Sequence, residues 1–159
     1  MPSFGLQLKA KLENVEYFKA PGEDFRWYLM LKCSNCGEEL KQWCYLSIEE
    51  SKEISSGRGY ANLVIKCKFC SRENSISITN NVPHKYDEED ERYKTFAIFE
   101  CRGIEPIGFS PREGFLAKSS ESETTFDNIS LKENEWVDYD EKAGCAVGIY
   151  DLESKFIRL

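Results

Sequence analysis

Apolar and polar side chains alternate along several short segments of this chain. In residues 6–13, leucine and alanine alternate with glutamine, lysine and glutamate. A period of two puts the two sets on opposite faces of an extended chain, so it predicts a half-buried β-strand. Further strands are predicted over residues 25–31, 42–48, 60–66, 75–79 and 95–101, with a turn-rich connection at 14–23. Helical periodicity is weak, and we therefore expect an all-β fold of sandwich or barrel type.

The composition changes between residues 80 and 92. This segment contains two adjacent asparagines, a proline and the acidic run 87–91, which is typical of a solvated linker. An acidic recognition patch is the alternative. We expect two β-rich lobes, residues 1–80 and 93–159, joined by linker 81–92.

The second half of the chain echoes the first. A shift of 89 residues aligns the alternating segment 6–12 with 95–101, and Gln42-Trp43 resembles Glu135-Trp136. This pattern suggests a duplication whose two lobes are related by a pseudo-twofold axis. It predicts that Trp43 and Trp136 occupy comparable positions in the core.

Composition indicates a folded protein with an acidic second half. The 159 residues are 41% hydrophobic and 13% aromatic, enough for one sizeable core. Residues 1–80 carry 11 Lys and Arg against 10 Asp and Glu, and residues 81–159 carry 10 against 18. Neither half offers the positive charge that neutralises phosphates, so nucleic-acid binding is not favoured.

The chain shows no sign of export. Its first residues lack a basic segment followed by a long apolar one, and no window is long and apolar enough to span a membrane. Seven cysteines are an odd number, and four stand in metal-type pairs, which fits a reducing compartment better than a disulfide framework. We expect a monomer in the cytoplasm, with a nuclear location also open.

Two Cys-x-x-Cys pairs carry the clearest chemistry. Cys33 and Cys36 form the first pair, and Cys67 and Cys70 form the second. Each tight turn aims two sulfurs at one ion, and two turns complete a tetrahedron with Zn–S distances of ~2.3 Å. We therefore expect one Zn²⁺ per chain, held by zinc knuckles in the first lobe, and a single zinc-binding module over residues 1–159. Four protein ligands leave no place for water, which favours a structural role.

Other reactive residues have weaker patterns. A redox dithiol or another metal is the alternative for the cysteine pairs, but the βαβ context of redox motifs is missing. Cys44, Cys101 and Cys145 lack ligand spacing, so we expect small hydrophobic residues and not a fifth ligand or a reactive thiol. His84 lies beside a proline in the linker, where we expect a surface residue and not a general base. The glycine-flanked Arg58 is an anion-binding candidate, although a plain turn is favoured.

Five aromatic residues lie in the predicted strands of the first half. A stacking platform for single-stranded nucleic acid is one interpretation. The strands also need core residues, and a core position is the favoured interpretation. The five residues are Trp27, Tyr28, Trp43, Tyr45 and Tyr60.

Several blocks of sequence stand out together: residues 6–14, 22–29, 33–37, 57–59, 66–75, 99–103 and 136–142. These blocks resemble the eukaryotic CXXC-motif-containing zinc-binding proteins, a family of uncharacterised function, over nearly the whole chain. The resemblance implies a β-rich intracellular protein with one zinc bound by the four cysteines of the two pairs. It implies no reaction and no catalytic residue.

Three functions follow from these patterns. We expect a non-enzymatic zinc-binding protein that acts through protein interaction, because the sequence offers no pairing of a nucleophile with a base. The alternative is metal or thiol handling, in zinc or copper homeostasis or in redox chemistry, since thiolates favour soft ions. Nucleic-acid binding ranks third because of the charge balance.

Overall fold

The computed structural model describes residues 2–55, 59–80 and 82–159, which form strands, turns and loops without a helix. The all-β prediction is confirmed, and the described residues contain no helix that could span a membrane. The strands are β1 (Ser3–Glu13), β2 (Val15–Lys19), β3 (Trp27–Cys33), β4 (Cys44–Leu46), β5 (Lys52–Glu53), β6 (Tyr60–Ala61), β7 (Leu63–Lys66), β8 (Glu73–Ile78), β9 (Lys85–Tyr86), β10 (Lys94–Arg102), β11 (Ile104–Ser110), β12 (Phe115–Ser119), β13 (Thr125–Ile129), β14 (Trp136–Asp140) and β15 (Cys145–Arg158).

Alternation in the sequence positions most of the long strands. Alternate residues of β3 are buried, beginning with Trp27, and the residues between them, beginning with Tyr28, face outward. The predicted connection at 14–23 is wrong in part, because β2 lies there. Its buried residues Val15 and Phe18 are three positions apart, so the period of two is missing.

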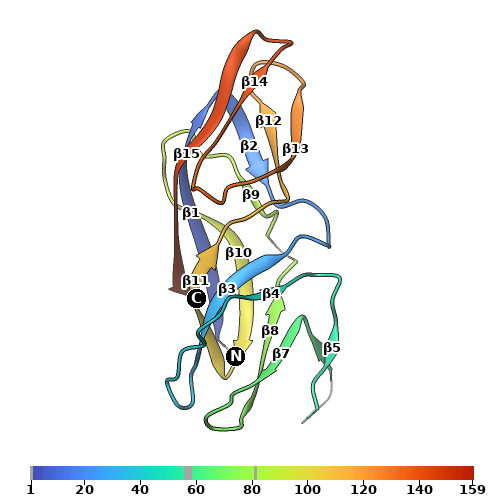
Figure 1. The fold of residues 1–159 in the computed structure, drawn as a ribbon, viewed down its shortest axis with the longest axis vertical. Helices are drawn as coiled ribbons and strands as arrows, with labels where there is room; N and C mark the ends of the chain where they lie inside the picture. Colours follow the sequence, from blue (N-terminus) through green and yellow to red (C-terminus); the bar gives the residue numbers. More distant parts are fainter. Residues whose placement is uncertain (1, 56–58, 81) are drawn as a thin grey trace.

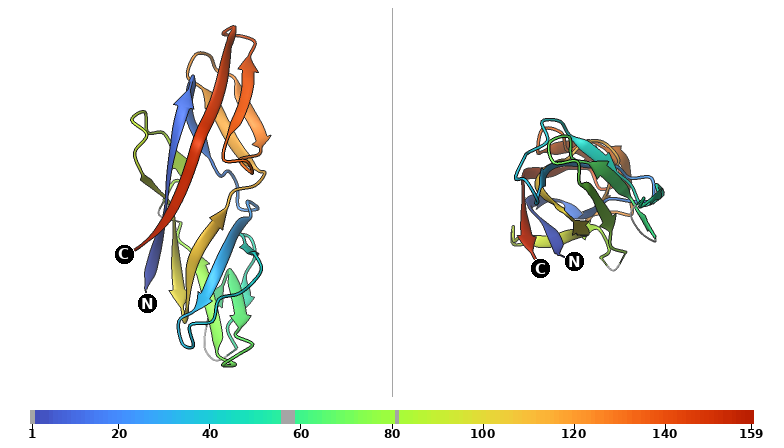
Figure 2. Two further views of the ribbon diagram at one scale, coloured as in Figure 1. Left: turned by 60° about the vertical axis from the view of Figure 1, so that its left-hand side comes forward. Right: turned by 90° about the horizontal axis from the view of Figure 1, so that it is seen from below.

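The described strands form four sheets. The largest has the order β14-β15-β1-β10-β8-β7, and the others are β11-β3-β4, β13-β12-β2-β9 and β5-β6. The molecule is elongated, with β1 and β15 paired along its length (Figure 1). Figure 2 shows the turn between β14 and β15 at one end and the turn between β7 and β8 at the other. We call the second the cysteine end, because its turns contain residues 33–36 and 67–70, and the first the opposite end.

The sheets do not separate into the predicted lobes 1–80 and 93–159. Strand β1 of the first half pairs with β10 and β15 of the second, and β3 pairs with β11. Three of the four described sheets therefore mix the two halves, and the predicted duplication is not confirmed. Trp43 is 41% exposed, whereas Trp136 is half-buried against Phe126, so the prediction of comparable core positions is wrong.

The segment predicted as a solvated linker contributes to the core. Within 82–92, strand β9 pairs with β2, and the Tyr86 side chain is fully buried and donates a hydrogen bond to the Arg92 carbonyl (2.8 Å). His84 is also buried, with its ring 5.1 Å from that of Trp27, so the surface prediction is wrong. Burial lowers the pKa of His84. Asn81, at the start of this segment, lies outside the described residues.

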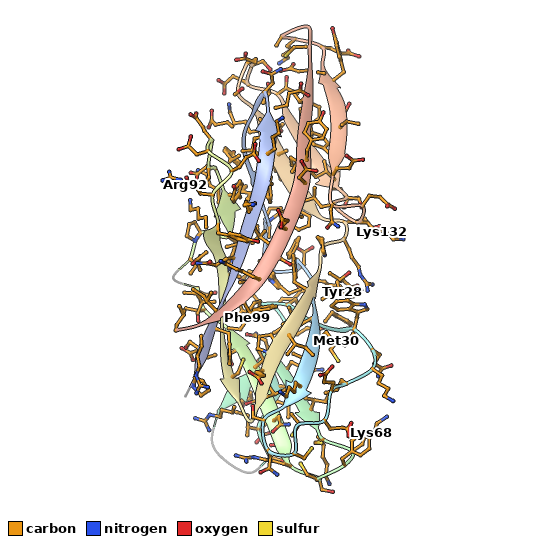
Figure 3. The ribbon with its side chains drawn as sticks, turned by 90° about the vertical axis from the view of Figure 1, so that its left-hand side faces the viewer. Tyr28, Met30, Lys68, Arg92, Phe99 and Lys132 are labelled. Atoms are coloured by element: carbon orange, nitrogen blue, oxygen red, sulfur yellow. The ribbon has the colours of Figure 1, made fainter. Side chains whose placement is uncertain are left out.

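One hydrophobic core runs between the sheets and is rich in aromatic rings. Trp27 and Phe99 are both buried, with ring centroids 5.9 Å apart. Figure 3 shows Tyr28 and Met30 on the side of the molecule away from Arg92. On this face of β3 both Tyr28 and Met30 are half-buried.

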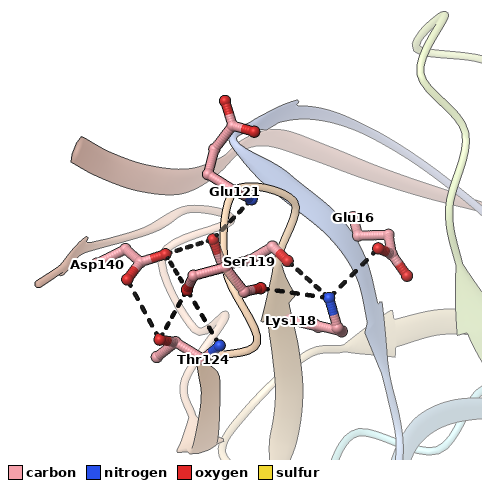
Figure 4. A network of polar contacts seen from close by, with 7 residues as sticks. Glu16, Lys118, Ser119, Glu121, Thr124 and Asp140 are labelled. Atoms are coloured by element: carbon pink, nitrogen blue, oxygen red, sulfur yellow. Dashed lines mark hydrogen bonds and ion pairs between the residues drawn. The ribbon is translucent and has the colours of Figure 1, made fainter. Parts of the chain in front are cut away.

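Buried Asp140 ties the turns of the opposite end together (Figure 4). Its carboxylate accepts hydrogen bonds from the hydroxyls of Ser119 (2.5 Å), Ser122 (2.6 Å) and Thr124 (3.2 Å). Two backbone N–H groups of the following turn donate to the same carboxylate, at 3.1 and 3.2 Å. These hydrogen bonds, with those from Ser119 and Ser122 the strongest, lower the pKa of Asp140 far below its ordinary value.

Candidate metal centre

The first cysteine turn follows β3 directly. Cys33 is the last residue of β3, and the Gly37 N–H donates to its carbonyl at 2.8 Å. Gly37 has a φ of 79°, in the left-handed region that glycine enters without strain. The turn therefore folds Cys36 back toward Cys33.

The second turn closes the hairpin of β7 and β8. The strands pair up to Lys66 and Glu73, and the Ser71 N–H donates to the Cys67 carbonyl at 2.9 Å. The Ser34 N–H of the first turn donates to the Gly103 carbonyl (3.0 Å), in the turn between β10 and β11. Because β10 pairs with β8 and β11 pairs with β3, the sheets hold both cysteine turns at one end.

The four predicted ligand residues lie together, with all their sulfurs within 4.8 Å of one another. The Sγ atoms of Cys33 and Cys70 are 3.7 Å apart, and those of Cys36 and Cys67 are 3.6 Å apart. A tetrahedron with Zn–S distances of ~2.3 Å has S–S edges of ~3.8 Å. The donor set and its spacing therefore fit one Zn²⁺ with four thiolate ligands.

The four thiols have different environments. Cys33 is buried, and burial acts to raise its pKa, but hydrogen bonds from the backbone of Cys36 and Asn35 outweigh this effect and lower the pKa to about 6. Cys36 is exposed; a backbone hydrogen bond from Glu38 acts to lower its pKa, but partial desolvation and the neighbouring sulfurs raise it to about 12. Sulfurs this close cannot all be thiolates without a cation, because their charges repel. A bound divalent cation removes the repulsion.

Asn74 supports the centre from inside and was not singled out by the sequence. It is buried, and its amide lies 3.7 Å from the Cys33 sulfur. In one orientation the amide nitrogen donates to that sulfur; in the other it donates to the carbonyls of Gly103 (3.1 Å) and Glu73 (3.3 Å). A Cβ atom at residue 103 would collide with the Asn74 side chain, so glycine is needed there.

A groove of about 420 Å³ lies beside the sulfurs. Leu40, Ile65 and Ile104 give it an apolar lining, and Cys33 and Cys67 also line it. At its rim, Phe69 is 71% exposed. Phe69 therefore extends the apolar surface at the edge of this groove.

The lysine and arginine residues near the four cysteines make different contacts. Lys32 forms an ion pair with Glu105 (3.7 Å), and Arg72 donates to the Asn35 side chain (3.4 Å), which links the two cysteine turns. Lys68 lies at the cysteine end (Figure 3) and lines the groove.

The remaining cysteines do not join the cluster. Among the described residues the metal-type group contains only the four cysteines of the pairs. Cys101 belongs to the core, and burial raises its pKa to about 12; Cys44 and Cys145 are half-buried, with pKa values raised first by desolvation. Arg58 lies outside the described residues.

Fold and site together define an all-β protein with one four-cysteine zinc centre. Residues 5–157 match the family described as "CXXC motif containing zinc binding protein, eukaryotic", and the chain belongs to this family. It is 50% identical to the Bos taurus protein of that name over 99% of both chains, and 52% identical to "UPF0587 protein v1g245604" of Nematostella vectensis over 100% of both. The solved structure "Crystal Structure of C1orf123" has a TM-score of 0.93 and 48% identity, covering 99% of both chains. The predicted family and zinc cofactor are thus confirmed.

Proposed function

We propose that Cys33, Cys36, Cys67 and Cys70 hold one structural zinc ion, and that the cysteine end presents its groove to a protein partner without catalysing a reaction. The observation that carries the first part is the set of four sulfurs, which fills a tetrahedral shell. A filled shell leaves no open position for a substrate or an activated water.

The zinc would join two parts of the chain that are otherwise linked through sheets and through a few side-chain hydrogen bonds, such as that from Arg72 to Asn35. Structural zinc sites in small peptides supply ~10–16 kcal/mol of apparent free energy at neutral pH. Such a centre fixes the end of β3 against the β7–β8 hairpin, and both turns form walls of the groove.

The groove and the exposed Phe69 support the interaction role. Their chemistry fits an apolar segment of a partner protein that has polar residues at its edges. The accessible surface of the groove is mainly apolar, lysines and glutamates also line it, and Phe69 would be desolvated on binding. We place the encounter in the cytoplasm or nucleus, where thiols stay reduced, and expect the free protein to be a monomer.

Two variants of exposed aromatic residues test the interaction. Phe69→Ser removes the groove aromatic, and Tyr60→Ser is a matched control because Tyr60 is 68% exposed and does not line the groove. Tagged proteins with equal zinc content would be recovered from cells and their partners quantified by mass spectrometry. The proposal predicts that a partner is lost with Phe69→Ser and kept with Tyr60→Ser; identical partner sets would contradict it.

Metal handling is the second candidate, because Cys36 is exposed to solvent. An exposed thiolate is open to attack by a competing ligand. A chelator in excess separates the candidates: a structural zinc leaves slowly and with unfolding, whereas an exchangeable zinc leaves quickly from a protein that stays folded.

A further inference from the structure

The outer face of the β11-β3-β4 sheet carries a second set of aromatic residues at the surface, of which Tyr28 is half-buried. Tyr28 of β3 and Tyr45 of β4 pair across the strands, with ring centroids 5.6 Å apart. Trp43 is 41% exposed and Tyr45 is 37% exposed. Trp43 reaches across β3, since a Cβ atom at residue 108 would lie 3.4 Å from its ring. Of the five aromatic residues expected in the core, Trp27 is buried and Tyr28 is half-buried, whereas the expectation is wrong for Trp43, Tyr45 and Tyr60.

Two arginines are held against the tyrosines of this face. The Arg112 guanidinium lies 3.9 Å from the centre of the Tyr28 ring, and the Arg26 guanidinium lies 4.5 Å from that of Tyr45. Because Tyr28 and Tyr45 are cross-strand neighbours, the two guanidiniums lie against neighbouring rings of one sheet face. Arg112 also donates to the Ser110 hydroxyl (3.3 Å).

Neither arginine forms an ion pair in the part of the chain that the structure describes; the ion pairs there use other cations. The residues outside the described ranges include no Asp or Glu. The two guanidiniums are therefore oriented by stacking while their N–H groups keep capacity for an anion.

Both arginines line one cavity of about 420 Å³. Tyr28 lines the same cavity and also belongs to the aromatic face of the sheet. Asn128 adds an amide to the lining, whereas Asp24 and Glu113 add carboxylates. The two carboxylates cancel the charge of the two arginines at longer distances, so the cavity has no long-range attraction for anions. An anionic ligand must therefore contact the guanidiniums directly. Two guanidiniums lining one cavity match a doubly charged phosphomonoester better than a single carboxylate.

We propose that this cavity binds a phosphorylated side chain of a protein segment, and that the residues beside the phosphate lie on Trp43 and Tyr45. The aromatic face, which continues from Tyr28, gives the flanking residues an apolar surface. The net charge of −7 does not favour a nucleic acid or an anionic membrane, both of which need an extended basic surface. The site is independent of the zinc centre.

Binding of a synthetic peptide by the zinc-loaded protein tests this proposal. The probe is a short peptide with one phosphoserine between two isoleucines, measured by calorimetry beside the unphosphorylated peptide and inorganic phosphate. Arg26→Gln and Arg112→Gln should each weaken phosphopeptide binding by about tenfold or more. Arg158→Gln removes an exposed positive charge from the end of β15 and should leave the affinity unchanged.

The controls make each outcome decisive. Unchanged zinc content and melting temperature would show that the variants are folded, and Arg112→Lys, which keeps the charge but loses the planar fork, should also bind weakly. No binding of the phosphopeptide, equal binding of the unphosphorylated peptide, or equal loss with Arg158→Gln would overturn the proposal. If inorganic phosphate bound as tightly as the phosphopeptide, the proposal that a protein segment occupies the cavity would be wrong.

Discussion

The cysteine end and the opposite end of this protein are stabilised by different means. Several strands near the cysteine end are short: β4 has three residues, β7 has four, and β5 and β6 have two each, although β3 and β8 have seven and six. Strands β1 and β15, which have 11 and 14 residues, continue toward the opposite end, where Asp140 joins the turns by hydrogen bonds. Strands this short make few hydrogen bonds and bury little surface. The comparison indicates that the metal centre compensates for short strands.

Removing one metal ligand should have the largest effect on stability, and this effect should be confined to the cysteine end. Cys67→Ser leaves three thiolates, so most of the ~10–16 kcal/mol of apparent zinc-binding free energy is lost. We expect zinc stoichiometry near zero and unfolding of the cysteine end, measured by elemental analysis and chemical denaturation. Cys145→Ser is the control because Cys145 lies outside the cluster. Native stability and full zinc content in Cys67→Ser would contradict the structural role.

A core truncation away from the cysteine turns should act without involving the metal. Phe115 is fully buried in β12, and its ring centroid lies 4.9 Å from that of Phe25. Phe115→Ala should lower the free energy of unfolding by about 3–5 kcal/mol, through lost burial and the cavity left behind. Denaturant titration measures the loss, and zinc content in native buffer should be unchanged. Loss of zinc from folded Phe115→Ala would mean that zinc binding depends on the packing of this part of the core.

A single methyl group tests the support beneath the sulfurs. Gly103→Ala places a Cβ atom against the Asn74 side chain at a φ of 74°, so we expect a destabilisation of about 1–3 kcal/mol and faster zinc loss. Gly144→Ala at the opposite end is matched, because its φ is 70° and the nearest atom to its Cβ is 3.9 Å away. Thermal melts and zinc release to a chromogenic chelator compare the two. Equal effects would show that the contact with Asn74 is unimportant.

Acid should reveal the contribution of Asp140. Its pKa is lowered in the folded protein, so the stability it adds is complete above the unfolded pKa of about 3.9 and is lost as the pH falls through the folded value. Asp140→Asn should therefore be less stable at pH 7 and should show a flatter loss of stability below pH ~4. Amide exchange in β14 and β15 as a function of pH measures this. If the stability of the native protein and of Asp140→Asn fell in parallel as the pH was lowered, the proposed contribution of Asp140 would be wrong.

The sequence predicted the site better than the topology. The spacing of two metal ligands in a Cys-x-x-Cys pair is contained within four residues, so Cys33 and Cys36 were identifiable without the fold. Strand pairing acts over long distances, and nothing local shows that β1 lies between β10 and β15. The two predicted lobes followed the order of the chain, whereas the sheets combine both halves.

Two further errors have local causes. The strand 42–48 has large side chains on both faces, and alternation alone does not say which face meets water; the Trp43 face is exposed. In residues 82–92 the acidic run masked the apolar contribution of Tyr86. Asn74 carried no signal as a single polar residue, although it lies in one of the blocks shared with the family.

The central claim is that zinc holds the cysteine end and not the opposite end. Hydrogen exchange of backbone amides, measured before and after removal of zinc by a chelator, tests it most directly. The account predicts one zinc per chain and a loss of protection in the β7–β8 hairpin after zinc removal, while β14 and β15 stay protected. Purified protein without zinc, or equal protection of the β7–β8 hairpin with and without the metal, would contradict it.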